Sequence, residues 1–108
     1  MDFIAHKPIY LQIADNICNK ILRKELLPDD RILSIRDLGI ELGVNPNTIT
    51  RSYEYLQSID IIYNKRGLGF FVSEGAREKI IAVEKERFLK TELPEILKKM
   101  ELLGIKNV

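Results

Sequence analysis

A tight turn between two short helical segments constrains this chain more than any other feature of its sequence. Gly43 suits the left-handed position just after a helix, and Asn45 followed by Pro46 suits the cap and first residue of the next one. Ile49, Tyr53 and Leu56 then continue the second segment with helical spacing. The sequence therefore predicts two helices that meet at a turn of about three residues.

The segments on either side of this pair have patterns of their own. From Pro8 to Leu26 isoleucines recur every fourth residue, at Ile9, Ile13, Ile17 and Ile21, which predicts a helix buried along one side. Ser34 and Asp37 resemble a capping box, with Leu38 and Leu42 as the expected buried face of the helix that follows. The β-prone runs 61–63 and 70–72, joined by a loop longer than two residues, predict a hairpin.

After Gly75 the composition becomes charged and typical of a helix. Apolar residues at helical spacing form a seam along this segment, which consists of Ile80, Ile81, Phe88, Leu89, Leu93, Ile96, Leu97, Met100 and Leu103. Pro94 should kink or split this helix, and Gly104 should end it. The seam must lie on the first domain or on a second copy, and we favour the second copy. All of its members except Ile80 and Leu103 are predicted to form a dimer interface. We therefore expect a first domain over 1–74 and a helical dimerisation arm over 75–108.

The predicted fold is α+β, mainly α, and three helices followed by a hairpin are typical of a winged helix-turn-helix. In this fold the N-terminal end of the third helix enters the major groove, while the wing approaches a minor groove or a phosphate. With a formal net charge of +1, any DNA affinity must come from how the charges are distributed. The residues predicted to contact DNA are Ser34, Arg36, Asn45, Asn47, Thr48, Arg51, Lys65, Arg66 and Gly67.

Four stretches between Pro8 and Val72 resemble the GntR-type winged-helix transcription regulators. They are PIYLQI, PDDRILSIRDL, VNPNTI and GLGFFV. In the same order, they correspond to the family patterns P-x-Y-x-Q-I, P-G-D-x-L-P-S-x-R-x-L, V-N-P-N-T-V and G-x-G-x-F-V. The short helical tail is similar to that of the YtrA-type subfamily, whose members dimerise through such helices. The chain departs from the family pattern at positions that are not contact residues, namely Lys24, Asp29, Leu33, Gly39 and Asp60.

The resemblance implies a sequence-specific transcription regulator, with repression as the expected sign. A homodimer should bind a near-palindromic operator in double-stranded DNA, because two-fold symmetry places two recognition helices on two half-sites. The short tail leaves little room for an effector pocket, so a small ligand would sit between protomers or be absent. The effector itself is unknown from the sequence.

The sequence also bears on other classes of function. The alternative hypothesis is a winged helix that contacts a partner protein without DNA, because a fold does not determine a function. No enzyme, cofactor or metal site is expected, since His6 and Cys18 are single copies and Asp29 and Asp30 are adjacent in a solvated turn. The glycines of the wing precede a strand-like run and not a helix, so they do not match a phosphate-binding loop.

Individual residues also have simpler interpretations. Arg36 and Arg51, taken singly, are more often solvated surface charges, and Asn45 is first of all a helix cap. A single cysteine in 108 residues, no secretory signal pattern and no apolar run of membrane-spanning length favour a cytoplasmic protein that does not enter a membrane.

Overall fold

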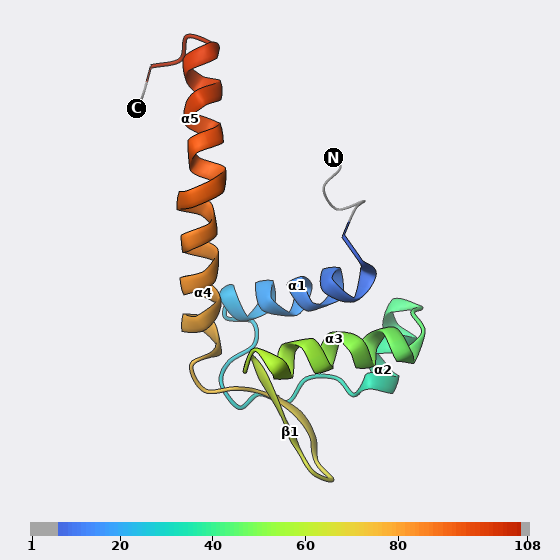
Figure 1. Ribbon diagram of the computed structural model, residues 1–108. Helices are drawn as coiled ribbons and strands as arrows, with labels where there is room; N and C mark the ends of the chain where they lie inside the picture. The colour runs from blue at the N-terminus through green and yellow to red at the C-terminus, as the bar shows by residue number, and fades with distance from the viewer. Residues whose placement is uncertain (1–6, 107–108) are drawn as a thin grey trace.

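The structure, a computed structural model, describes residues 7–106. Its elements are, in order, α1 (Ile9–Leu22), α2 (Ile35–Leu42), α3 (Pro46–Ser58), β1 (Ile62–Lys65), β2 (Gly69–Val72), α4 (Ala76–Arg87), the π-helical segment η2 (Phe88–Glu92) and α5 (Leu93–Leu102). Figure 1 shows a unit of three helices and a hairpin from which α4, η2 and α5 rise as one rod. The predicted fold class, mainly α with a small β-hairpin in a winged helix-turn-helix, is confirmed.

The core lies where α1 packs along α3. Ile13, Ile17 and Ile21 of α1 are buried, as are Ile49 and Leu56 of α3. The first isoleucine of the predicted stripe is different, because Ile9 is 58% exposed at the open end of α1. The prediction that all four isoleucines share one buried face is therefore wrong for its first member.

The first helix ends earlier than predicted. Its last residue is Leu22 and not Leu26, because Lys24 adopts a left-handed conformation with φ of 64°. The backbone N–H groups of Glu25 and Leu26 then donate to the carbonyl of Lys20, which satisfies an acceptor at the end of the helix. The sequence suggested a longer helix because Leu26 continues its apolar pattern.

Helices α2 and α3 lie close together at the predicted turn. Gly43 has φ of 65°, and the N–H of Val44 donates to the carbonyl of Gly39 at 2.9 Å. A Cβ atom on Gly39 would lie 3.0 Å from the Val44 carbonyl oxygen, so a bare backbone fits best at this position. Because Leu38 and Gly39 form the buried side of α2, Leu42 is rotated outward and is 46% exposed, contrary to the prediction.

The hairpin is antiparallel, with Ile62 opposite Val72 and Lys65 opposite Gly69. Its strands extend further than predicted, so the connecting turn consists only of residues 66–68. The loop before α2 adds to the sheet, because the N–H of Ile32 donates to the carbonyl of Phe70 at 2.9 Å. The wing is thereby attached to the same loop that leads into α2.

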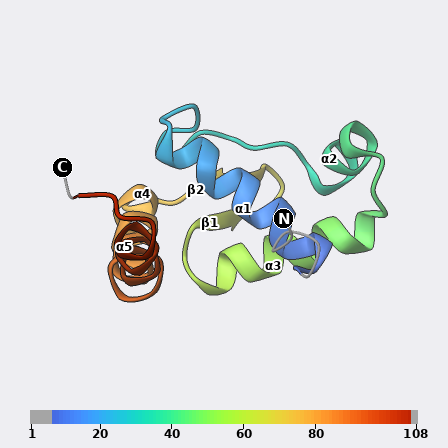
Figure 2. The ribbon, with the colours of Figure 1, turned by 90° about the horizontal axis from the view of Figure 1, so that it is seen from above.

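The helical arm, which consists of α4, η2 and α5, is attached by its first turns alone. Ala76 and Ile80 are buried in the core, whereas no residue of η2 or α5 is buried. Ile80 therefore belongs to the core and not to the open seam in which the sequence placed it. Figure 2, seen along the arm, shows that α5 stands clear of α1 and α3.

The arm makes the molecule elongated. Its radius of gyration is 16.9 Å, against about 13 Å for a compact domain of 100 residues. Pro94 does divide the helix as predicted, but the break is a π-helical segment that ends two residues before it, and the rod stays continuous (Figure 1). A wider turn reduces the clash of the proline ring with the preceding carbonyl groups. No helix within residues 7–106 is long and apolar enough to cross a membrane.

Candidate nucleic-acid interface

The N-terminal end of α3 is fixed by short-range hydrogen bonds that the sequence predicts. The side chain of Asn45 accepts a bond from the N–H of Asn47 at 2.7 Å, and Pro46 occupies the first turn. At the start of α2, the Ser34 hydroxyl oxygen accepts a bond from the N–H of Asp37 at 3.0 Å. Asn45 and Asn47 are exposed, while Thr48 is half-buried beside them. The helix end thus presents polar side chains on a rigid backbone.

The four predicted DNA-contacting cations are exposed and have no carboxylate partner within residues 7–106. Arg36 lies on α2, Arg51 on α3, and Lys65 and Arg66 at the tip of the wing. Some other Lys and Arg side chains on the described surface form ion pairs, including Arg23 with Glu25 and Arg87 with Glu84 on α4, while others, such as Lys85 and Lys98, are also without one. Unpaired cations on three neighbouring elements form a surface that can accept phosphates.

A hollow of about 410 Å³ joins the start of α1 to the start of α3. Its lining brings three of the predicted residues together, Asn47, Thr48 and Arg51, next to Ile9 and Tyr10. The Arg51 guanidinium lies over the Tyr10 ring, 4.2 Å from its centroid. Ile9, which lies outside the core, is thus part of the lining of this hollow.

The wing carries the remaining predicted residues on a braced hairpin. Gly67 has φ of 78°, so the turn needs a residue that tolerates the left-handed region. The Tyr63 hydroxyl donates to the carboxylate of Asp29 at 2.8 Å, and this bond raises the pKa of Tyr63. Lys65 lies 5.2 Å from the centroid of the Phe71 ring. These contacts fix the direction in which the wing tip points.

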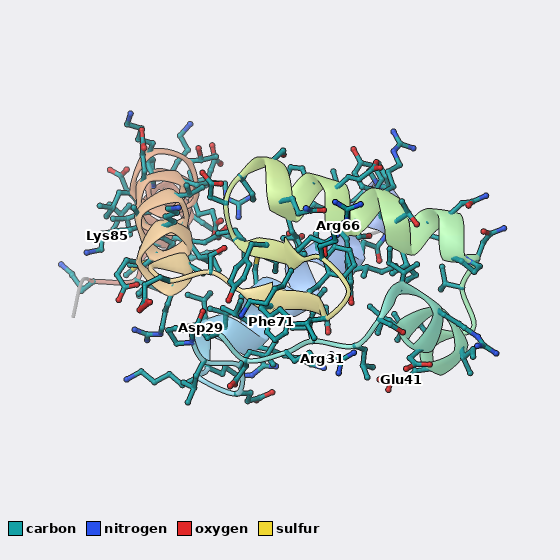
Figure 3. The ribbon with its side chains drawn as sticks, turned by 90° about the horizontal axis from the view of Figure 1, so that it is seen from below. Asp29, Arg31, Glu41, Arg66, Phe71 and Lys85 are labelled. Atoms are coloured by element: carbon teal, nitrogen blue, oxygen red, sulfur yellow. The ribbon has the colours of Figure 1, made fainter. Side chains whose placement is uncertain are left out.

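The structure adds a cation that sequence reasoning missed. Arg31 is exposed beside the hairpin (Figure 3), and its Nε would lie 3.1 Å from a Cβ atom built on Gly69. It also lines a hollow of about 430 Å³ with Ser34, away from the hollow that holds Asn47. The pairing of residues 29–32 with β2, in which Arg31 lies opposite Phe71, brings Arg31 to the wing from a distant part of the sequence, so no local pattern marks it.

Of the groups weighed as candidates for catalysis or metal binding, Cys18 is partly buried between α1 and the arm. Burial raises the pKa of the Cys18 thiol to about 11, which keeps it protonated at neutral pH. His6 lies outside the described residues. Within residues 7–106, no three His, Cys, Asp or Glu side chains are grouped as metal ligands.

Two curated proteins of Bacillus subtilis are similar to most of the chain. The HTH-type transcriptional regulator YhcF is 42% identical over 95% of this chain and 84% of its own length. The HTH-type transcriptional repressor YtrA is 30% identical over 91% of this chain and 75% of its own length.

Solved structures are similar to this one over most of its elements. A GntR-family transcriptional regulator from Bacteroides thetaiotaomicron is 48% identical, with a TM-score of 0.71 over 92% of this chain and 86% of that one. The DNA-binding domain of AraR, in complex with an operator, is 32% identical, with a TM-score of 0.59 over 61% of this chain and 80% of that one. Residues 9–72 match the family described as bacterial regulatory proteins, gntR family. The chain belongs to this family and is YtrA-like within it.

Proposed function

We propose that the protein is a transcriptional repressor that binds a near-palindromic operator as a homodimer. The observation that carries the proposal is the set of exposed cations without carboxylate partners on α2, α3 and the wing, around the capped start of α3. An AraR domain with this fold is known in complex with an operator, and the relative YtrA is named a repressor. The family consists of regulators, and we infer no enzymatic activity for this member.

The contacts proposed for each element follow from the geometry of a winged helix on DNA. Asn45, Asn47, Thr48 and Arg51 face the major groove at the start of α3, where short polar and cationic side chains reach base edges and phosphates. Ser34 and Arg36 lie at the first turn of α2, beside the DNA backbone. Lys65, Arg66 and Gly67 reach a minor groove or a phosphate from the wing.

We propose that residues 1–74 bind DNA and that residues 75–108 form the dimer interface. The exposed apolar seam of the arm supports it, because an apolar face of this length is rarely left in water. A small-molecule effector, if the regulator has one, would bind between protomers. A bacterial regulator that acts on chromosomal DNA functions in the cytoplasm, which is where we place this one.

The experiment that tests the proposal is selection of bound sequences from random duplex DNA, followed by titration of the selected duplex at several salt concentrations. We expect an inverted repeat with two half-sites, and an affinity that falls steeply with salt as counterions are released. Absence of any enriched sequence would contradict the proposal. It would favour a winged helix that contacts a partner protein.

Replacing Lys65 by alanine should weaken binding to selected and scrambled duplexes by the same factor. A lysine at the wing tip contributes a point charge toward a phosphate and reads no base. The slope of log affinity against log salt concentration should therefore fall by about one per subunit. Fluorescence anisotropy at four salt concentrations measures both quantities.

Lys98→Ala is the matched control, because this exposed lysine lies on α5, far along the arm from the wing (Figure 1). Its salt slope should equal that of the wild type. A selective loss on the selected duplex for Lys65→Ala would show that the wing tip reads sequence.

A further inference from the structure

We infer that Tyr10 is a positioning residue of the DNA interface, whose ring holds the Arg51 guanidinium ready for DNA. The inference rests on the proposed function and assigns a part in it to the start of α1, which is not itself proposed to touch DNA. Neither the helix-turn-helix geometry nor the positions of the exposed cations requires such a residue. The inference follows from the contact between the side chains of Tyr10 on α1 and Arg51 on α3.

The contact itself is a cation held against an aromatic face. The Cζ atom of Arg51 lies 4.2 Å from the centroid of the Tyr10 ring, well inside the range of a cation–π interaction. Glu54 is one turn further along α3, yet the ion pairs formed within residues 7–106 do not include one between it and Arg51. A guanidinium held over a ring forms no carboxylate hydrogen bonds there, so its N–H groups stay available for phosphate or base acceptors.

The Tyr10 ring is fixed in turn by the packing of α1 on α3. The ring of Tyr55 contacts it edge-on, with centroids 6.5 Å apart and planes at 81°. The backbone carbonyl of Tyr10 accepts a hydrogen bond from the hydroxyl of Ser52 at 2.7 Å, and Ser52 is fully buried. The platform beneath Arg51 therefore has little freedom to move relative to α3.

The position of the stacked arginine suits a role at the interface. Arg51 lines the hollow of about 410 Å³ that also contains Asn47 and Thr48, the polar residues of the recognition helix. An exposed arginine normally samples many rotamers, and ordering one on binding costs conformational entropy. A ring that already restricts these rotamers reduces that cost when DNA binds.

The test is a double-mutant cycle on the full chain with the selected duplex and a scrambled duplex. Tyr10→Leu removes the aromatic face and keeps an apolar side chain, whereas Tyr10→Phe keeps the face and removes the hydroxyl. We expect Tyr10→Leu to weaken binding to the selected duplex about fivefold and Tyr10→Phe to change it less than twofold. In an Arg51→Ala background, Tyr10→Leu should cause no further loss.

A readout without DNA separates positioning from general destabilisation. In the free protein, NMR should show ring-current shifts of the Arg51 side-chain protons in the wild type and in Tyr10→Phe, and their loss in Tyr10→Leu. Thermal unfolding midpoints identify any variant that has merely lost stability. An equal loss of affinity for Tyr10→Leu with and without Arg51 would overturn the inference.

The other outcomes are equally decisive. A Tyr10→Phe variant that binds as weakly as Tyr10→Leu would assign the effect to the hydroxyl group and overturn the inference. If the wild type selects a sequence and Tyr10→Leu binds it normally, the inference alone fails. If the wild type selects no sequence, the proposed function fails and the inference fails with it.

Discussion

Replacing Leu97 by aspartate is expected to convert the proposed homodimer to a monomer. Leu97 is 53% exposed on the apolar seam of α5, and the arm covers none of this face with residues of its own chain. Two-fold symmetry would place two copies of the new carboxylate in one interface. Because each buried, unpaired charge costs several kcal/mol, the dissociation constant should rise by roughly a thousandfold or more.

Sedimentation velocity over a range of protein concentrations measures this change directly. Lys98→Asp is the matched control, because it adds the same side chain at the next exposed residue of α5, on the side of the helix turned away from the seam. The control should remain a dimer, and both variants should keep the wild-type helix content by circular dichroism. A dimer that persists in Leu97→Asp would place the interface on another surface.

The parts of the fold that local chemistry determines were predictable from the sequence. Asn45 caps α3 and Gly43 ends α2 because each suits a backbone position that few residues tolerate. Asp60 has a left-handed conformation with φ of 60°, which aspartate adopts more readily than most residues. These features depend on residues close together in the chain, so a single sequence contains the information for them.

The features that the sequence did not predict depend on the surroundings of a residue. Lys24 ends α1 in a conformation for which lysine has no special preference, so tertiary packing determines where that helix stops. Leu42 is apolar and correctly spaced, but the close contact at Gly39 sets which side of α2 is buried. Periodicity identifies an apolar face without saying whether another element lies against it.

The same distinction applies to the candidate interface. The residues of the turn and the wing tip could be named from their motifs, and the structure places them on neighbouring elements. Arg31 and Tyr10 could not be named, because the first reaches the wing through a long-range strand pairing and the second meets Arg51 across two helices. Contacts between distant segments become visible only in three dimensions.

Replacing Arg51 by alanine is expected to reduce the preference for the selected duplex over a scrambled one by about tenfold or more. A good arginine contact with a base edge is worth about 1–3 kcal/mol of discrimination against a wrong base. Arg51 suits this role because its guanidinium is exposed, stacked on Tyr10 and free of carboxylate partners within residues 7–106.

The measurement for Arg51→Ala is the ratio of the dissociation constants for the two duplexes at one salt concentration. A change in specificity alters this ratio, whereas an equal loss of affinity for both duplexes does not. Affinity for the scrambled duplex should change little, since α2 and the wing keep their cations. Arg23→Ala is the control, because this exposed arginine pairs with Glu25 beyond the end of α1 and should leave both constants unchanged. Equal losses on both duplexes for Arg51→Ala would make Arg51 a phosphate contact, and the reading of bases at the start of α3 would then depend on Asn45, Asn47 and Thr48.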